Sequence, residues 1–259
     1  MRRLSLALFV AYALNAAYDP LSHWLHWPRP SWLVHLLTVS YFLFAVVHAG
    51  TYLGWRNALT FWGISFGVSL AFESAGVATG AFYGPYHYGD KLGPKLFGLV
   101  PVLIPMAWFM MVYSTHGLVA VLAPGRRRSV WWAVWLAGVS AVAMTAWDLS
   151  MDPAMVGGGF WTWHQPGPFF GIPISNYLGW LETTFVVYLL YRLLELRWPP
   201  RDERLDWFGL LPFGAYILTW LNQVFSRTLT GHPELGLTAF FAMGAFVLAA
   251  LTTLVHKRQ

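Results

Sequence analysis

The chain has 259 residues, of which 57% are hydrophobic and 18% aromatic, while only 10% are charged. Soluble domains carry about 25% charged residues, so this composition and a mean hydropathy of +0.51 exclude an ordinary soluble domain and place the chain in a lipid bilayer. Cysteine is absent, which excludes disulfides and thiolate chemistry. The net charge of +5 reflects where Arg and Lys lie along a membrane protein, so we expect no nucleic-acid partner.

Eight apolar runs approach the length of about 20 residues that a helix needs to cross the hydrocarbon core. We expect spans at 4–18, 32–53, 58–79, 97–121, 130–151, 174–192, 207–226 and 236–255. The sequence therefore predicts an all-α, polytopic membrane bundle that forms one transmembrane domain over residues 1–259. The first run is short and follows Arg2 and Arg3, so a signal peptide is the alternative for that run.

Basic residues alternate from loop to loop between the two sides of this predicted bundle. Twelve of the 16 Lys and Arg residues fall on one side: Arg2, Arg3, Arg56, Arg126, Arg127, Arg128, Arg192, Arg197, Arg201, Arg204, Lys257 and Arg258. The other side holds Arg29, Lys91, Lys95 and Arg227. The positive-inside rule then predicts that both termini are cytoplasmic and that loops 80–96 and 152–173 lie together on the non-cytoplasmic side.

These two loops are rich in glycine, proline and aromatic residues, and loops of this length in a compact bundle are usually functional. The first reads GAFYGPYHYGDKLGPK and holds Tyr83, Tyr86, Tyr88 and Lys95; the second holds Trp161 and Trp163. The functional interpretation is a lid over a ligand, with aromatic faces that stabilise a cation. The alternative is an aromatic girdle at the membrane interface.

Four acids lie inside or at the ends of the predicted spans, where a carboxylate costs about 2.5–3.5 kcal/mol on insertion scales. The direction of each span places all four in the non-cytoplasmic half of the bilayer. Three amide side chains share that depth, so one polar pocket can contain the whole set: Glu73, Asp148, Asp152, Glu182, Asn176, Asn222 and Gln223.

Two of these acids stand four residues apart in AWDLSMDP, residues 146–153. Asp148 and Asp152 share a helix face and repel each other as anions, and Pro153 is expected to end the helix at Asp152. A helix C-terminus and burial both disfavour an anion as well. Together these effects favour at least one neutral carboxylic acid, which is what a general acid requires.

Structural interpretations stay open for each acid. Asp152 is also explained as a residue that ends a helix at the interface, and Asp148 as a buried hydrogen-bonding acid. Glu73 is also explained by backbone groups that need an acceptor, and Glu182 by a polar packing face or a tyrosine partner.

Several motifs of other functions are incomplete in this chain. His23 and His26 form an isolated HxxH without the histidine clusters of a di-iron site, and no lysine lies mid-span for a retinal Schiff base. Asp148 and Asp152 spell DxxxD, as in membrane prenyltransferases, but the second DxxxD at Asp202 and Asp206 faces the opposite side by the charge count. We therefore expect no metal and no cofactor.

Two stretches in order, YGPYHYGDKLGPKLFGLVPVLIPMAWFMM and AWDLSMDPAMV followed by GFWTWHQPGPFFGIPISNYLGW, resemble the membrane carotenoid hydratases. This family comprises the carotenoid 1',2'-hydratases and the bisanhydrobacterioruberin hydratases, and the resemblance covers about residues 72–185. It implies cofactor-independent addition of water to the terminal double bond of an acyclic carotenoid end group, which gives a tertiary alcohol.

The chemistry of alkene hydration assigns roles to the candidate residues. Asp148 or Asp152 donates the proton as a neutral acid, and the ionised neighbour or Glu73 deprotonates the attacking water. Tyr88, Trp161 and Trp163 stabilise the carbocation, and Asn176 positions the water. The remaining substrate-binding candidates are Tyr83, Tyr86, Glu182 and Lys95, and the carotenoid enters from the lipid.

Two other functions remain open at this point. A proton-coupled transporter would use Glu73, Asp148 and Glu182 as a relay, but the cytoplasmic halves of the spans are apolar apart from His48 and scattered Ser and Thr. A membrane prenyltransferase would use the DxxxD motif.

Overall fold

The computed structural model describes residues 1–125, 129–200 and 205–256. Within these ranges the chain forms eight α-helices: α1 (Arg2–Trp24), α2 (Leu33–Tyr52), α3 (Trp55–Thr79), α4 (Leu103–Leu122), α5 (Val130–Gly157), α6 (Ile174–Arg197), α7 (Leu211–Leu229) and α8 (Pro233–His256). Four short strands lie between them: β1 (Tyr86–Tyr88), β2 (Lys95–Leu96), β3 (Val100–Pro101) and β4 (Trp161–Trp163). Each expected span is thus confirmed as a helix.

Some of the charged residues whose side of the membrane was predicted lie outside the described ranges. These are Arg126, Arg127, Arg128, Arg201, Asp202, Arg204, Lys257 and Arg258.

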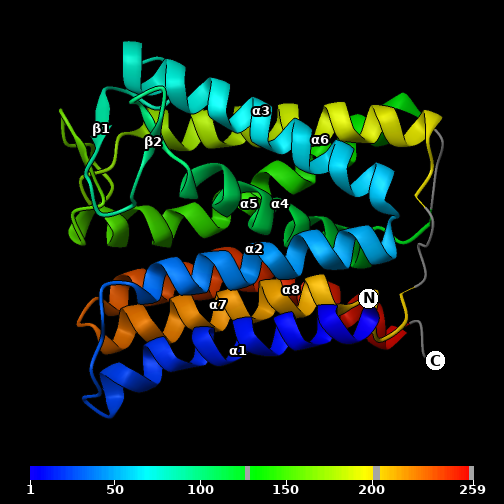
Figure 1. Cartoon of the computed structure of the whole chain (residues 1–259), viewed down its shortest axis with the longest axis horizontal. Helices are drawn as coiled ribbons and strands as arrows, with labels where there is room; N and C mark the ends of the chain where they lie inside the picture. Colours follow the sequence, from blue (N-terminus) through cyan, green and yellow to red (C-terminus); the bar gives the residue numbers. More distant parts are fainter. Residues whose placement is uncertain (126–128, 201–204, 257–259) are drawn as a thin grey trace.

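Successive helices run in opposite directions along one bundle axis (Figure 1). The N-terminus and the end of α8 lie at one end of the bundle, and β1 and β2 lie at the other. The start of α1 and the end of α8 therefore lie opposite the two long loops, while the placement of both termini and of the site relative to the membrane stays a prediction.

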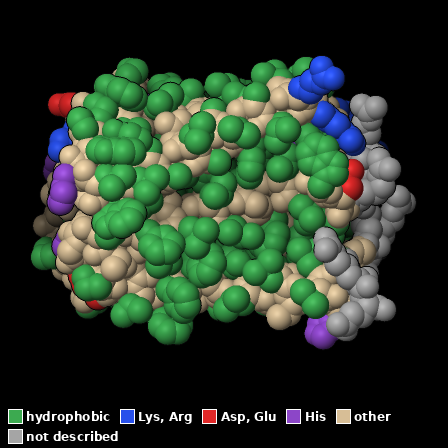
Figure 2. All heavy atoms as spheres, turned by 90° about the horizontal axis from the view of Figure 1, so that it is seen from below, with side chains coloured by type: hydrophobic (Ala, Val, Ile, Leu, Met, Phe, Trp, Pro, Cys, Tyr) green, Lys and Arg blue, Asp and Glu red, His purple; other side chains and the backbone are tan. Residues whose placement is uncertain are grey.

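Six of the helices, α1 to α5 and α8, are long and apolar enough to cross a membrane. Hydrophobic side chains cover the middle of the face shown in Figure 2, and the coloured charged and histidine side chains lie toward its two ends. Large apolar side chains on this and other helix surfaces are open to the surroundings, for example Leu14 at 68%, Trp131 at 82% and Phe241 at 68% exposed. An apolar belt between polar ends is the surface that a lipid bilayer requires.

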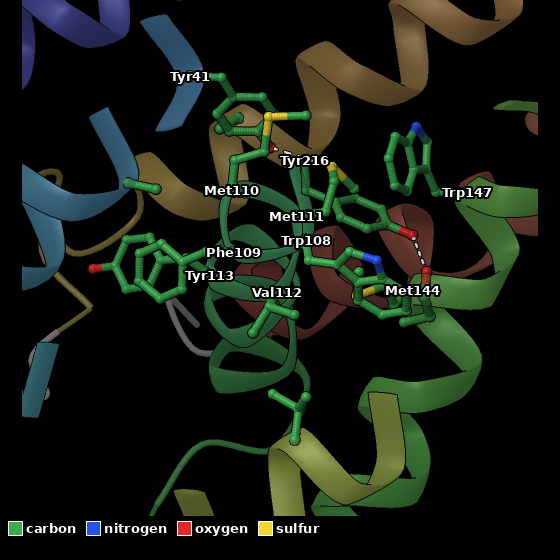
Figure 3. Close-up of a cluster of buried hydrophobic side chains, with 14 of the residues drawn as sticks. Tyr41, Trp108, Phe109, Met110, Met111, Val112, Tyr113, Met144, Trp147 and Tyr216 are labelled. Carbon is green, nitrogen blue, oxygen red and sulfur yellow. Dashed lines mark hydrogen bonds between the residues drawn. The ribbon is translucent and has the colours of Figure 1, made fainter. Parts of the chain in front are cut away.

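Helix α4 is the centre of the bundle and buries most of its side chains. Figure 3 shows Trp108 to Tyr113 pointing from α4 toward the neighbouring helices. Two hydrogen bonds connect buried hydroxyl groups there: the Tyr41 hydroxyl donates to Ser114 Oγ at 2.7 Å, and Tyr12 bonds to Thr219 at 2.8 Å. These bonds join α1, α2, α4 and α7, so α1 packs as an integral helix of the bundle.

The expectation that Pro153 ends the fifth helix at Asp152 is wrong. Helix α5 continues through Pro153 to Gly157, because the proline removes only the hydrogen bond to the Leu149 carbonyl and a packed membrane helix tolerates that loss. The helix ends instead where Gly159 adopts a φ of +68°, which glycine permits without steric strain. Asp152 therefore lies more than a turn before the helix end, where the helix dipole has little effect on a carboxylate.

Candidate active site

The two long loops meet at one end of the bundle and form a cap, defined here as residues 80–101 and 158–173. Strands β1 and β4 pair antiparallel, with Tyr86 opposite Trp163 and Tyr88 opposite Trp161. In both strands the outer two side chains are buried and the central one is exposed. Since alternate residues of a strand face opposite sides, the four buried aromatic side chains all face the helices beneath the cap.

The first acidic centre under the cap is Glu73 of α3, whose carboxylate has three hydrogen-bond donors. Trp108 Nε1 donates to Oε1 at 2.9 Å, and the hydroxyls of Tyr86 and Tyr88 both donate to Oε2, the latter at 2.7 Å. Burial raises the pKa of both tyrosines well above the usual value, and the nearby Glu73 charge adds to the rise, so both keep the protons that they donate. Glu73 thereby fastens β1 to α3 and α4.

The second acidic centre is the pair of Asp148 and Asp152 on α5, both fully or almost fully buried. Asn176, in the first turn of α6, donates through its amide nitrogen to Asp148 Oδ2 at 2.9 Å and to Asp152 Oδ2 at 2.6 Å. Trp161 Nε1 donates to Asp152 Oδ1 at 2.6 Å. Asp148 Oδ1 is buried and has no hydrogen-bond partner among the residues described.

Aromatic rings join the two acidic centres. The rings of Tyr88 and Trp161 meet edge to face with centroids 5.8 Å apart, and each ring carries a donor to one of the centres. Trp108 stacks on Trp180 at 4.2 Å, and Trp147 meets the edge of Trp180 at 5.8 Å. The acids therefore lie in one aromatic region that combines α3, α4, α5, α6 and the cap.

Three further polar atoms in this part of the chain are buried without a partner among the described residues. They are the indole nitrogens of Trp147 and Trp163 and the hydroxyl of Tyr177. Buried polar groups are nearly always hydrogen-bonded. Unpaired hydroxyl and indole groups also occur elsewhere among the described residues, for example at Ser65 and Trp62, whereas Asp148 Oδ1 is the one unpaired buried carboxyl oxygen among them. Such a region suits the binding of water or of a polar reacting group.

The structure brings together most of the residues predicted from sequence: Glu73, Asp148, Asp152, Asn176, Tyr86, Tyr88, Trp161 and Trp163. Tyr83 has a different place, because its ring is wedged between α3 and α6 and its hydroxyl bonds to Thr183 at 2.7 Å. Lys95 fixes the cap, since its amine donates to the Tyr88 carbonyl at 2.8 Å and to Asp90 at 3.2 Å.

The prediction that Glu182 faces the shared pocket is wrong, because its side chain is exposed. Thr183 and Thr184 are buried next to it, and adjacent residues of a helix point in different directions. Of the two amides on α7, Gln223 reaches α5 and accepts from Ser150 at 3.3 Å, whereas Asn222 donates to the Ala16 carbonyl of α1.

Trp108 is the functional candidate that the sequence interpretation missed. It lies five residues after the start of α4, and Glu73 lies six residues before the end of α3. Because consecutive helices are antiparallel, residues at these distances from the shared end lie at the same depth. The equal depth of Trp108 and Glu73 on neighbouring spans is the sequence signal that could have identified Trp108.

The structure also bears on the metal-site and DxxxD interpretations. Among the described residues, no group of three or more His, Cys, Asp or Glu side chains could hold a metal ion. Asp206 lies just before α7, at the end of the bundle opposite the cap, and accepts from the Gly209 amide at 2.8 Å. It is therefore remote from Asp148 and Asp152, as the charge count predicted.

This fold and this site define a class: a polytopic helical membrane protein that buries three carboxyl groups beneath an aromatic cap. Residues 31–252 match the family described as carotenoid biosynthesis protein, and the chain belongs to that family. It is similar to a bisanhydrobacterioruberin hydratase of Haloarcula japonica, with 40% identity over 123 residues, which are 48% of this chain and 41% of that protein. The matched part thus spans less than half of the curated relative. No solved structure matches the chain.

Proposed function

We propose that the protein is a hydratase that adds water across the terminal double bond of an acyclic carotenoid end group and forms a tertiary alcohol. Membership of the carotenoid biosynthesis family and the name of the Haloarcula relative support the substrate class and the reaction type. The observation that carries the proposal is the state of Asp148 Oδ1. Of the six oxygens on the three buried acids, it is the one without a partner in the described chain.

Hydrogen bonding separates the roles of the two aspartates. Asp152 accepts one donor on each oxygen, which stabilises its carboxylate form, while Asp148 accepts on Oδ2 alone. Two ionised carboxylates that share one amide in a buried site repel each other strongly. The favoured arrangement is an ionised Asp152 next to a neutral Asp148 whose proton sits on Oδ1.

The reaction then begins at Asp148. Its Oδ1 proton moves to the less substituted carbon of the terminal double bond, so the positive charge forms on the tertiary carbon. Water attacks that carbon, and the Asp148 carboxylate takes the proton that the attacking water loses. The carotenoid gains one water, Asp148 returns to its acid form, and no proton is gained or lost in the cycle.

Groups around Asp148 stabilise the charged intermediate. The faces of aromatic residues such as Trp161 and Trp163 attract a cation, by about 2 kcal/mol each when desolvated. The anions of Asp152 and Glu73 add electrostatic stabilisation that is strong in a water-poor site. Asn176 donates both of its amide hydrogens to the two aspartates. Its proposed role is therefore to orient this pair, in place of the expected role of positioning the water.

Expression of the gene in bacteria that accumulate lycopene tests this function directly. We expect a pigment heavier by one water per modified end, with the oxygen derived from water when cells or membranes are supplied with ¹⁸O-labelled water. Full-length protein in the membrane fraction with unchanged lycopene would contradict the proposal. A product labelled from molecular oxygen would contradict it as well.

A further inference from the structure

Two histidines lie next to each other on the outer face of the cap. His87 is the central residue of β1, and its side chain is exposed while both of its neighbours in the strand are buried. His164 directly follows β4 and is exposed as well. The imidazoles approach to 3.1 Å between His87 Nδ1 and His164 Nε2, although 77 positions separate the two residues in the sequence. Neither histidine has a role in the proposed hydration reaction.

The paired backbones of β1 and β4 hold the two histidines in place. His87 lies opposite Thr162 in the ladder, and the His164 amide extends the ladder by donating to the Pro85 carbonyl at 2.9 Å. The two histidines are therefore diagonal neighbours on one face of the paired strands, a position from which aromatic side chains reach each other. Because the backbone is already ordered, a ligand that binds between them does not have to order it.

The distance between the two facing nitrogens suits a shared metal ion. Imidazole nitrogen binds Zn²⁺ at about 2.0–2.1 Å, so two such ligands are about 3.3 Å apart at a tetrahedral angle and about 2.9 Å apart at a right angle. The observed 3.1 Å lies between these values. The imidazole that donates the hydrogen bond shifts its hydrogen to its other ring nitrogen, and both facing lone pairs then bind the ion.

The ligand type selects the class of ion. Imidazole suits late first-row ions such as Zn²⁺ and Cu²⁺, whereas Mg²⁺ and Ca²⁺ prefer oxygen ligands. In the part of the chain that the structure describes, no third His, Cys, Asp or Glu joins this pair, so water completes the coordination of an ion on this exposed face. Structural zinc sites use four protein ligands, and a site with two binds its ion more weakly and exchanges it with the surroundings.

An ion in this position connects the two strands that cover the buried acids. Strand β1 carries Tyr88, whose hydroxyl donates to Glu73, and β4 carries Trp161, whose indole donates to Asp152. These side chains face the helices beneath the cap, while the two histidines face outward. A bridge between the histidines therefore opposes the separation of β1 from β4, and with it the exposure of both acidic centres.

We propose that His87 and His164 form a binding site for a late first-row divalent cation, with Zn²⁺ as the expected ion, and that the bound ion clamps the cap closed. The site is distinct from the buried acids and takes no part in the proposed reaction. It makes the order of the cap depend on the concentration of the ion outside the bundle.

Electron paramagnetic resonance of bound Cu²⁺ tests the ligands, since the spectrum reports the number of coordinated imidazoles. One equivalent of Cu²⁺ is added to the full-length protein in detergent, without a histidine tag, at pH 8, because binding requires neutral imidazole. We expect two imidazoles in the wild-type protein and at most one in His87→Ala and in His164→Ala. His232→Ala, which removes another exposed histidine, is the matched control and should keep both. One imidazole in the wild type, or two in either cap variant, would overturn the site.

Amide hydrogen exchange tests the clamp. Exchange of the ladder amides requires β1 and β4 to separate, and an ion that binds only the closed cap reduces this opening by the factor 1 + [ion]/Kd. At a Zn²⁺ concentration of about ten times the Kd, exchange in residues 86–88 and 161–163 should slow about tenfold in the wild type and in His232→Ala. It should not change in His87→Ala or His164→Ala, whose substituted side chains are exposed and whose folding we expect to be intact.

Three results would contradict the inference. Equal slowing by Zn²⁺ in the wild type and in both cap variants would show that the ion acts elsewhere and would overturn the site. Equal slowing by Mg²⁺ would overturn the assignment to imidazole ligands. Two coordinated imidazoles without slower exchange would overturn the clamp. Because neither measurement uses a carotenoid, a failure of the hydratase function leaves their outcome unchanged.

Discussion

The substitution Asp148→Asn tests the site most sharply, because it removes the proposed proton donor and keeps the other contacts of this side chain. The amide oxygen of the new residue can accept from Asn176 where Asp148 Oδ2 now accepts at 2.9 Å. The amide nitrogen then takes the place of Oδ1, the oxygen that has no partner among the described residues. No existing hydrogen bond is lost, so we expect the free energy of unfolding to change by less than about 1 kcal/mol.

Activity should respond very differently from stability. A positioned general acid contributes about 10²–10⁴-fold to a rate, and each tenfold corresponds to about 1.36 kcal/mol of activation free energy. We therefore expect Asp148→Asn to raise the barrier by roughly 3–5 kcal/mol and to reduce kcat for lycopene hydration by the same factor. Turnover in purified membranes, followed by chromatography of the pigments, measures the loss.

Two matched variants complete this experiment. Asp152→Asn places an amide nitrogen against either Trp161 Nε1 or the Asn176 amide, since both Asp152 oxygens accept hydrogen bonds. It should therefore lose about 1–3 kcal/mol of stability. Glu182→Gln alters an exposed acid of α6 and should behave as wild type. The assignment of Asp148 as proton donor is refuted if Asp148→Asn keeps more than a tenth of wild-type turnover.

Two further predictions concern the cap. Trp161→Phe keeps the aromatic ring but removes the 2.6 Å hydrogen bond to Asp152; we expect a loss of about 1–3 kcal/mol, seen as a lower melting temperature in detergent, and unchanged stability would refute the role of this bond. Gly179→Ala would put a Cβ 2.6 Å from the Tyr83 ring and should cost about 1–3 kcal/mol. Gly138→Ala, whose Cβ meets nothing within 4 Å, is the control and should stabilise α5 by about 0.5–1 kcal/mol.

The helices could be predicted from sequence because the bilayer sets both their length and their composition. Every expected span overlaps a helix, and the two ends of the bundle hold the loops assigned to them. The bounds were less accurate: α5 runs to Gly157 through Pro153, and α6 runs to Arg197. Packing against neighbouring helices outweighed the tendency of Pro153 to end the helix. A hydropathy pattern contains no information about that packing.

The sequence predicted the members of the site where the depth of a residue in the bilayer determined whether it joins the site. It did not predict them where the direction of the side chain determined this. Glu73, Asp148, Asp152 and Asn176 came together as their depth implied, whereas Glu182 shares the depth and points outward. When the faces of a helix differ little in hydrophobicity, its sequence does not show which face is buried. The pairing of β1 with β4 joins segments more than 70 residues apart, and no local pattern specifies such a pairing.

The proposed mechanism differs from that of a proton carrier in the proton path that it requires. Hydration takes up and releases one proton per cycle, and in the proposed mechanism Asp148 performs both transfers, so the reaction needs no proton path through the bundle. The opposite end does hold polar groups, because Arg192 and Glu195 are buried there, although the sequence suggested a mostly apolar half. Between the two ends the Tyr188 hydroxyl donates to the Val112 carbonyl, and a backbone carbonyl accepts a hydrogen bond without passing a proton on. In the proposed mechanism, a closed proton cycle at Asp148 therefore accounts for the three carboxyl groups that lie together beneath the cap.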